Sequence, residues 1–590
     1  MNDTPRAGGE RRLRSQRWFG TDDLSGLAHR STLTPIGLSR EHFDGRPFIG
    51  IAQSWSDFAP CNVHFRQIAE HVKRGVAEAG GVAMEFPTIS LGENLAKPTA
   101  MLFRNLMAMD VEESIRMYPM DAVVLLGGCD KTLPAQLMGA ASVDIPTIVV
   151  TAGPTTPRIH AGRQLGGGTD AWKLAERVRS GVADGAEVAD LEASIMSTPG
   201  HCNEMGSAST ISAASEALGL ALAGSSTIPA MDGRRLAAAA EAGRRAVRLA
   251  RDGSPLPSEI LSRDALENAV TLLMALGGST NAIVHLLALA GRLGVGLDLD
   301  DFARISARTP LLANLRPSGE FQVQELDAAG GVPAVLKELS PLLHLDAPTV
   351  TGRTIGQEIA GARVTDRTVI ASMDAPLART GGLAVVHGSL APDGAVIKTS
   401  AASPDLLVHR GRAVVFDNIR DLAARIDDPD LEVAASSVLV LRNCGPKGGP
   451  GMPEWGMLPI PAKLLAQGVT DMVRISDARM SGTAFGTNVL HVAPEAAVGG
   501  PLALVEDGDL IVLDVPSGIL DLEVPATELE ERRRELKLPP PRYRRGYGAL
   551  YLRHVQQSNT GCDLDFLTAQ PGDPADNEPE GILEGWHGGW

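Results

Sequence analysis

The chain has 590 residues, of which 44% are hydrophobic and only 4% aromatic, and its net charge is −17. A chain of this length exceeds what one hydrophobic core supports, so we expect two or more domains. The negative charge argues against non-specific nucleic-acid binding, and the absence of any apolar run of roughly 18–20 residues argues against a membrane span.

Up to about residue 375, apolar runs alternate with amphipathic stretches. Residues 121–126 (DAVVLL) and 145–153 (IPTIVVTAG) are typical of buried strands. A helix starting at Pro134 is predicted between them, because proline favours the first helical turn. The predicted helices are residues 65–81, 134–144, 233–253 and 263–276. This alternation predicts a parallel sheet covered by helices.

After about residue 376 the pattern changes to short strands separated by turns. Many closely spaced strands predict a β-barrel or β-sandwich. The tail after Gln570 is acidic and glycine-rich, and we expect it to fray. The predicted strands are residues 383–390, 395–400, 411–417, 437–443, 471–477, 502–515 and 519–525.

Three of the five cysteines, Cys61, Cys129 and Cys202, lie in polar loops about 70 residues apart. A single cysteine is more often a small buried residue, and no CxxC pair is present. Three thiolates could instead hold an iron–sulfur cluster and leave one iron free to act as a Lewis acid. The N-terminus lacks the apolar core of a signal peptide, so we expect the cytoplasm, where thiols stay reduced.

Hard-metal ligands stand beside one of these cysteines. In GGCDKT, at the end of the strand 121–126, Asp130 and Lys131 follow Cys129 directly, and Glu93 and Glu454 lie in other glycine-containing loops. A single loop carboxylate is usually a solvated surface charge, but carboxylates from separate loops suit Mg²⁺. Lys131 would repel a cation unless CO₂ carbamylated it into an anionic oxygen ligand.

Two glycine-rich turns offer hydroxyl groups. In the first, SDARMSGTAFGT, Ser481 and Thr483 lie on either side of Gly482. A serine acts as a base only where a cation or dipole stabilises its alkoxide. An ordinary turn stabilised by the serine hydroxyl is the alternative. In the second turn, Ser279 or Thr280 either binds substrate oxygens or caps a helix.

Taken together, these motifs resemble the dihydroxy-acid and sugar-acid dehydratase family. Within it, GHCNEMGSAST, SDARMSGTAFGT and the segment 542–567 favour the branch that dehydrates pentonates such as L-arabinonate and D-xylonate in sugar-acid catabolism. The resemblance extends over nearly the whole chain. Nine motifs occur in the family's order: PCNVH, SLGE, GGCDKT, GHCNEMGSAST, GGSTNA, LAPDGAVIK, GPKGGPGMPE, SDARMSGTAFGT and HVAPEAAVGGP.

The resemblance implies a set of roles for residues of this chain. A 2Fe–2S cluster would be held by Cys61, Cys129 and Cys202. Mg²⁺ would be held by Glu93, Asp130, carbamylated Lys131 and Glu454. Ser481 would be the base and Thr483 a supporting hydroxyl, whereas Cys444 and Cys562 match no cluster position and are expected to be structural.

The resemblance also implies the architecture and the assembly. Residues 1–375 would form an α/β domain that carries the cluster cysteines and most Mg²⁺ ligands. Residues 376–590 would form a β-barrel-like domain that carries Glu454 and Ser481 and ends in a helical tail. The protein would be a homodimer or homotetramer.

The implied reaction is dehydration of a 2,3-dihydroxy acid to a 2-keto-3-deoxy acid. Mg²⁺ would bind the carboxylate and the 2-hydroxyl, Ser481 would remove the C2 proton, and the open iron would take the departing 3-hydroxyl. Alternatives are dihydroxy-isovalerate dehydration in branched-chain amino-acid biosynthesis and a non-catalytic sugar-acid-binding relative. A phosphate-binding enzyme using GPKGGPG is disfavoured, because no Walker pattern is present.

Overall fold

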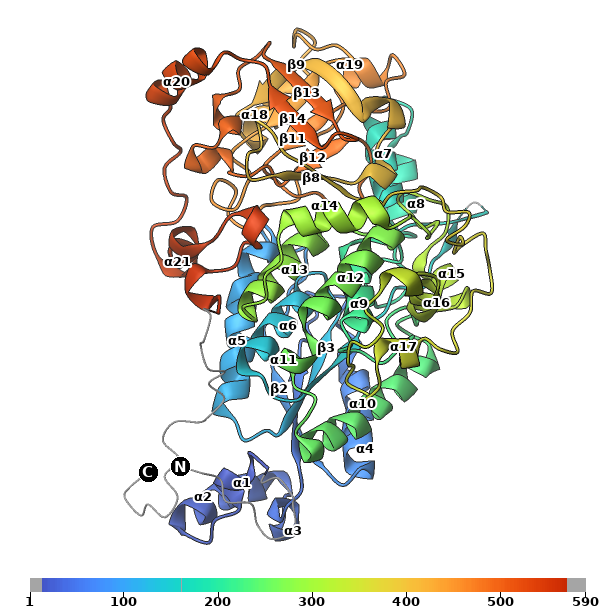
Figure 1. The fold of residues 1–590 in the computed structure, drawn as a ribbon, viewed down its shortest axis with the longest axis vertical. Helices are drawn as coiled ribbons and strands as arrows, with labels where there is room; N and C mark the ends of the chain where they lie inside the picture. The colour runs from blue at the N-terminus through green and yellow to red at the C-terminus, as the bar shows by residue number, and fades with distance from the viewer. Residues whose placement is uncertain (1–12, 161, 570–590) are drawn as a thin grey trace.

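The computed structural model describes residues 13–160 and 162–569, so the predicted fraying after Gln570 lies outside the described residues. Figure 1 shows a helix-rich part below and a strand-rich part above. Three short helices lie at the base of the lower part: α1 (Gln16–Phe19), α2 (Leu24–Leu33) and α3 (Arg40–Phe43). Within the described residues, no helix is both long and apolar enough to cross a membrane.

The lower part is built on a four-stranded sheet in the order β2-β1-β3-β4. All three strand pairs are parallel. β1, β3 and β4 are buried along their whole length, as expected of parallel strands covered on both faces. The strands are β1 (Phe48–Gln53), β2 (Val82–Pro87), β3 (Ala122–Gly127) and β4 (Thr147–Thr151).

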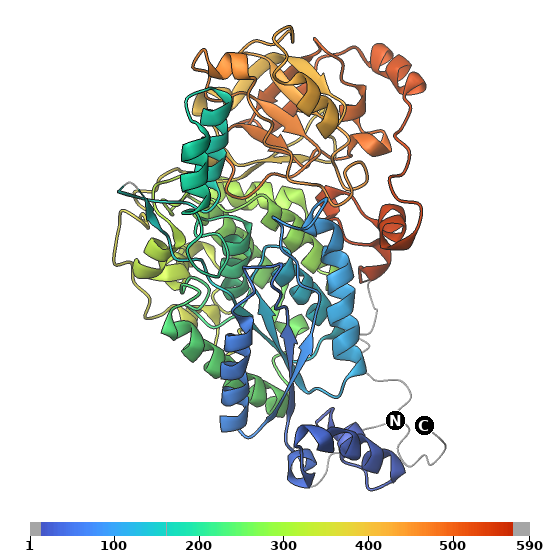
Figure 2. The same cartoon turned by 180° about the vertical axis from the view of Figure 1, so that it is seen from behind.

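Helices cover both faces of this sheet (Figures 1 and 2). α4 (Phe65–Glu78) and α10 (Gly233–Asp252) pack together on one face, and α5 (Arg104–Met117) and α6 (Thr132–Val143) on the other. α4 and α10 approach closely because Gly75 faces α10, where a Cβ would clash with the carbonyl of Ala240. The sheet and its covering helices confirm the predicted α/β architecture.

One predicted helix start is wrong. α6 begins at Thr132, after Lys131, and not at Pro134. Proline is tolerated at this third position because N–H groups in the first helical turn have no intrahelical partner. Only residues 128–131 therefore connect the end of β3 to the start of α6, so the loop that contains Cys129, Asp130 and Lys131 is held at both ends.

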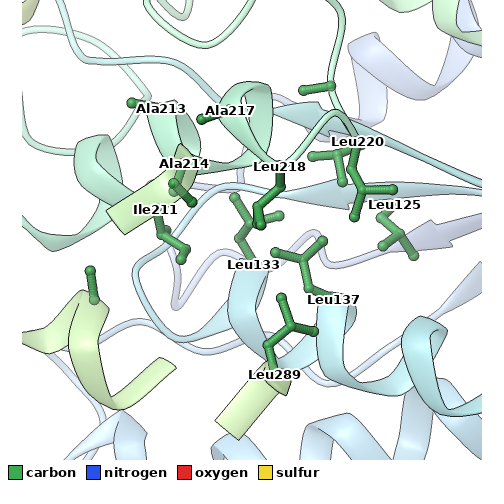
Figure 3. Close-up of a cluster of buried hydrophobic side chains, with 14 of the residues drawn as sticks. Leu125, Leu133, Leu137, Ile211, Ala213, Ala214, Ala217, Leu218, Leu220 and Leu289 are labelled. Atoms are coloured by element: carbon green, nitrogen blue, oxygen red, sulfur yellow. The ribbon is translucent and has the colours of Figure 1, made fainter. Parts of the chain in front are cut away.

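A second layer of buried helices packs against α6. Figure 3 shows Leu125 of β3, Leu133 and Leu137 of α6, Ile211 of α9 (Ser207–Ala217) and Leu289 of α13 (Asn281–Arg292) in one apolar cluster. Because α9 and α13 are buried nearly all round, their N-terminal turns are held in fixed positions. The other elements of this half are α7 (Thr169–Arg179), α8 (Gly185–Glu192), α11 (Pro257–Ile260), α12 (Arg263–Leu276), α14 (Leu299–Arg308), α15 (Val323–Ala328), α16 (Gly331–Glu338), α17 (Ile355–Glu358), β5 (Ile159–His160) and β6 (Arg163–Gln164).

The upper part is an eight-stranded sheet in the order β14-β13-β9-β10-β11-β12-β8-β7. A bridge between His387, just after β7, and Ile519 of β14 brings the two edges together and closes the sheet into a barrel. The strands from β9 to β12 are parallel neighbours. The strands are β7 (Ala384–Val386), β8 (Ala395–Ile397), β9 (Val408–Phe416), β10 (Val438–Leu441), β11 (Arg474–Ser476), β12 (Asn488–Leu490), β13 (Leu510–Asp514) and β14 (Ile519–Leu522).

Successive side chains along each strand point alternately into and out of the barrel, and this produces two apolar layers in the upper part. Ala413 and Val415 face the barrel interior, whereas Val414 and Phe416 pack outside against α18 (Ile419–Arg425). The predicted barrel-like architecture is confirmed. The start of the predicted strand 502–515 is instead a 3-10 helix (Pro501–Leu504), and β12 was not predicted.

The chain returns to the lower part after the barrel. After β14 it passes through α20 (Ala526–Glu535) and α21 (Gly546–His554), whereas α19 (Ala462–Leu465) lies earlier, between β10 and β11. The buried guanidinium of Arg104 in α5 donates hydrogen bonds to the carbonyls of Gly561 and Cys562. The last described segment is therefore anchored to the helices of the lower part.

Candidate active site

The motif GGCDKT lies at the carboxyl end of β3, beside the carboxyl end of β1. The chain leaves β1 through Cys61 toward α4 and leaves β3 through Cys129 toward α6, and these helices cover opposite faces of the sheet. Adjacent parallel strands whose connections diverge leave a crevice at their carboxyl ends, where open α/β sheets bind ligands. The topology therefore places this strand end in a natural binding crevice.

The barrel contributes residues from the carboxyl ends of two of its own parallel strands. Glu454 lies in the loop that follows β10, and Ser481 in the loop that follows β11. The Glu454 loop rests on the lower part at Gly451, which has φ +88° and where a Cβ would clash with Leu102. The site is therefore assembled between the two parts of the fold.

Four predicted metal ligands come together there. One carboxylate oxygen from each of Glu93, Asp130 and Glu454 lies within 4.8 Å of the other two. Lys131 Nζ lies 3.2 Å from Glu93 Oε2 and 3.4 Å from Glu454 Oε1, and it also contacts Asp130. The lysine ammonium thus balances part of the negative charge of the three carboxylates.

The pKa values of these groups reflect burial and mutual charge. Burial, together with the charge of Glu93, raises the pKa of Glu454. Burial opposes ionisation of Glu93 too, but Lys131 and Arg479 lower the pKa of that carboxyl. Glu93 Oε2 is buried and, apart from the Lys131 ammonium 3.2 Å away, has no polar partner at hydrogen-bond distance in the described part of the chain. An oxygen atom with free lone pairs, beside two other carboxylates, fits a hard divalent cation.

The three predicted cluster cysteines also gather in the crevice. A hydrogen bond to the Cys61 thiol, reinforced by burial, raises the pKa of Cys129 far above its usual value. Burial, followed by the charge of Cys61, raises the pKa of Cys202. Thiols bind metals as thiolates, so a bound cationic centre would reverse these shifts. The donor set fits a three-thiolate iron–sulfur site.

Ser481 and Thr483 form a hydroxyl pair on the neighbouring loop. Ser481 Oγ lies 3.0 Å from Thr483 Oγ1, and Ser481 is half-buried. The turn needs Gly482, where a Cβ would lie 2.5 Å from the backbone nitrogen of Ser207. On the other side, a Cβ at Gly168 would clash with the Thr483 hydroxyl. Close backbone packing therefore fixes both hydroxyls.

Sequence reasoning did not single out two side chains that hold Glu454. Arg479 is fully buried, and its Nη1 lies 3.1 Å from Glu454 Oε1. Asn281 Nδ2 donates to the same oxygen at 3.1 Å and to Ser207 Oγ at 2.8 Å. Both residues lie inside motifs already recognised, SDARMSGTAFGT and GGSTNA, but an arginine or asparagine in a loop gives no sequence sign of its partner.

In the GGSTNA turn, Ser279 stabilises the start of α13, whereas the N-cap residue Thr280 makes no side-chain cap. Ser279 Oγ accepts a hydrogen bond from the backbone N–H of Asn281 and pairs with Ser207 Oγ. Thr280 Oγ1 is buried and has no hydrogen-bond partner among the described residues. Ser279 therefore orients Asn281 toward Glu454, and Thr280 keeps a free hydroxyl.

Two buried histidines, His285 and His491, lie near the buried cation Arg479. Burial, followed by the charge of Arg479, lowers the pKa of His491 to about 3. Burial, followed by the charge of Arg104, lowers the pKa of His285 well below its usual value. In the described part of the chain, Nε2 of each ring has no hydrogen-bond partner. Both rings are therefore neutral at physiological pH.

The two remaining cysteines contact other groups. The thiol of Cys444 contacts the carbonyl of Arg442, and that of Cys562 contacts the sulfur of Met452. Both are buried. Among the described residues they have no thiol neighbour, which is consistent with structural roles.

Known proteins match this chain along nearly its full length. The family description "Dihydroxy-acid/6-phosphogluconate dehydratase" matches with its N-terminal model over residues 46–358 and with its C-terminal model over residues 368–562. The L-arabonate dehydratase of Azospirillum brasilense is 51% identical, over 95% of this chain and 98% of the relative. The 6-deoxy-6-sulfo-D-gluconate dehydratase of Pseudomonas putida is 48% identical over 94% and 96%.

A relative with another activity is less similar. The dihydroxy-acid dehydratase of Ignicoccus hospitalis is 41% identical, over 91% of this chain and 98% of the relative. The two family models match both parts of the fold that contribute loops to the site, and the relatives that are about 50% identical match nearly the whole chain. The chain belongs to the dihydroxy-acid/6-phosphogluconate dehydratase family and is a dehydratase.

Proposed function

We propose that this dehydratase acts on an aldonic acid, a pentonate such as L-arabinonate or D-xylonate, and releases the 2-keto-3-deoxy acid. The higher identity to the L-arabonate and sulfogluconate dehydratases than to the dihydroxy-acid dehydratase supports a sugar-acid substrate. The observation that carries the proposal is the meeting of three carboxylates, three thiols and the Ser481–Thr483 pair in one crevice.

The donor sets support two cofactors. Mg²⁺ would be held by Glu93, Asp130, Glu454 and a carbamylated Lys131, and a 2Fe–2S cluster by Cys61, Cys129 and Cys202. When bound, these groups supply Lewis acidity toward the substrate carboxylate and hydroxyls. Carbamylation would convert Lys131 from a competitor of the metal into one of its ligands.

The chain's own residues then carry the proton. Ser481 Oγ, as the alkoxide, would accept the C2 proton, and Thr483 Oγ1, 3.0 Å away, would then be the donor of the hydrogen bond between the two hydroxyl groups. Arg479 and Asn281 hold Glu454 in place. Loss of the C2 proton and of the 3-hydroxyl gives an enol, and the departing hydroxide takes the proton back from the Ser481 hydroxyl, so that water is released and the serine base is restored. The enol tautomerises to the 2-keto-3-deoxy acid.

The test is an anaerobic assay of the cofactor-loaded enzyme against a panel of aldonates and 2,3-dihydroxy-isovalerate, with 2-keto acids detected. The panel contains pentonates and hexonates, because the relatives act on both chain lengths. We expect the largest kcat/KM for a pentonate. A preference for dihydroxy-isovalerate would support the branched-chain alternative. Tight aldonate binding without turnover would support a non-catalytic relative.

We further infer a cytoplasmic homodimer or homotetramer. All five cysteines are free thiols, and three of them are proposed ligands that need a reducing compartment. Light scattering during size-exclusion chromatography measures the assembly. A monomer of 61.9 kDa under assay conditions would contradict the oligomer.

A further inference from the structure

A second cavity, of about 690 Å³, lies on the outer side of the barrel. It is open to solvent on one side and lies between the barrel and the segment 536–542, part of the connection from α20 to α21 along the edge of the molecule (Figure 1). Its volume is in the range of small-molecule pockets, roughly 300–1,000 Å³. None of the proposed ligands or hydroxyls of the candidate active site lines it. We call it the basic cavity.

The lining of the basic cavity is strongly cationic. Its only lining carboxylate among the described residues is Asp417, against five cations: Arg420, Arg442, Lys447, Lys537 and Arg542. Arg442 already has partners in the protein, because its guanidinium pairs with Asp417 and donates to the carbonyls of Ala503 and Val505. The whole chain carries a net charge of −17, so this surface opposes the overall field.

Four cations in the cavity form no ion pair among the described residues, although the charge of Lys447 also acts on the buried carboxyl of Glu495 behind the lining. The side chains of Arg420, Lys447, Lys537 and Arg542 make no ion pair or hydrogen bond within the described ranges 13–160 and 162–569. Many other arginines of the molecule do pair with a carboxylate, as Arg410 does with Glu523. Like charges around one concavity repel one another, and a bound anion would remove that repulsion.

The cavity also has an apolar wall. Trp455, Leu538 and the prolines 539–541 line it beside the cations. Consecutive prolines favour an extended conformation with little freedom, so this wall is formed before a ligand arrives. A cationic side and an apolar side together fit a ligand that has a charged group and a planar or apolar body.

We propose that the basic cavity binds a small phosphorylated molecule. The phosphate would lie among Arg420, Lys447, Lys537 and Arg542, and the uncharged body against Trp455 and Leu538. A phosphate carries nearly two negative charges and matches the fork of a guanidinium, so it fits an excess of four positive charges better than a single carboxylate does. The site is independent of the proposed dehydration.

Calorimetric titration of the holoenzyme tests this, with AMP, adenosine and inorganic phosphate as probes. We expect AMP to bind more tightly than phosphate, adenosine not to bind, and affinity to fall as salt rises. The double variant Lys447→Gln, Arg542→Gln should weaken AMP binding at least about tenfold, because two charge-assisted contacts are lost. The control Lys337→Gln, Arg363→Gln removes two exposed cations from the other half of the fold and should bind AMP normally.

Three results would overturn the proposal. The first is no binding of AMP or phosphate at low salt. The second is an equal loss in the control variant, which would show that the interaction is non-specific. The third is a lower oligomeric mass of Lys447→Gln, Arg542→Gln without any AMP binding to the parent protein, which would show that a second copy of the chain fills the cavity. Circular dichroism checks that each variant is folded.

Discussion

The guanidinium of Arg479 lies 3.1 Å from Oε1 of Glu454, and both side chains come from loops at the carboxyl ends of neighbouring barrel strands. Arg479 also lies 4.0 Å from Glu93 Oε2, so it reaches across to the lower part of the fold. It donates to Thr99, which in turn donates to Glu93. One buried cation therefore links the carboxylates contributed by the two halves of the molecule.

Replacing Arg479 by glutamine should destabilise the metal-free protein. The change leaves Glu454 and Glu93 buried with less compensating charge, and breaking a buried pair typically costs about 3–5 kcal/mol. Denaturant unfolding in the presence of a chelator measures the change in the free energy of unfolding. The control Arg410→Gln breaks an exposed pair with Glu523 and should cost less than about 1 kcal/mol. Equal losses in the two variants would contradict the proposed role of Arg479.

The cysteines should fall into two classes. Serine replacements of Cys61, Cys129 or Cys202 should abolish the iron–sulfur absorbance, whereas Cys444→Ser and Cys562→Ser should keep it. The protein prepared anaerobically should contain about two irons and two sulfides per chain, as a 2Fe–2S site requires. Iron and acid-labile sulfide analysis is the measurement. Active enzyme without iron, or with stoichiometric zinc, would rule out the cluster.

Much of the fold could be predicted from the sequence because its strands are apolar and its helices amphipathic. The runs at β3 and β4 are continuous and buried on both faces, so hydrophobicity alone revealed them. β12 (Asn488–Leu490) was missed because it directly follows the glycine-rich motif SDARMSGTAFGT and begins with a polar residue, so only Val489 and Leu490 of the strand are apolar. Closure of the barrel through His387 and Ile519 is a long-range pairing that no local pattern contains.

The predicted site depended on the neighbours of Cys129 and on the family's motifs. The sequence could indicate that Asp130 lies near a cluster ligand, because the two residues are adjacent. It could not indicate that Arg479 and Asn281 both reach Glu454, because those contacts depend on how the barrel is placed on the lower part. Burial of Lys131 among three carboxylates likewise follows only from the folded structure.

The two proposed metal sites should be separable by mutation. Glu93→Gln and Glu454→Gln should weaken Mg²⁺ binding and activity while leaving the iron–sulfur spectrum intact, because thiolates and carboxylates are different residues. Mg²⁺ titration of activity and the visible absorbance are measured on the same samples. If a well-folded variant loses the absorbance, the carboxylate supports the cluster instead.

Carbamylation of Lys131 in the metal-free protein should depend on pH. Burial and Arg479 lower the pKa of this lysine, but Asp130, Glu93 and Glu454 more than compensate and raise it overall. The ammonium therefore stabilises the fold at every pH below the ordinary lysine pKa, near 10.4, and this contribution is lost only as the pH rises through the folded value. At neutral pH almost no free amine is present.

Carbamate formation consumes that free amine, whose fraction rises about tenfold per pH unit below the pKa. At a fixed concentration of dissolved CO₂, carbamylation should therefore accelerate about tenfold per pH unit between roughly pH 7 and 9. The carbamate signal from ¹³C-labelled CO₂ measures the rate, and Lys131→Arg, which cannot form a carbamate there, is the control. A rate that does not change with pH would show that the amine is already free.

Ser481 is the decisive residue for the mechanism, because an unassisted serine is a poor base. Ser481→Ala should keep the fold, the cluster and substrate binding but lose turnover by about 10²–10⁴-fold, the usual contribution of general-base catalysis. Thr483→Val should cost less, because Thr483 supplies one hydrogen bond to the serine. Loss of deuterium from C2 of labelled substrate, followed together with turnover, separates proton removal from later steps. If Ser481→Ala turns over normally, the base is another group, and His285 becomes the residue to replace next, because its ring is neutral and its Nε2 has no hydrogen-bond partner among residues 13–160 and 162–569.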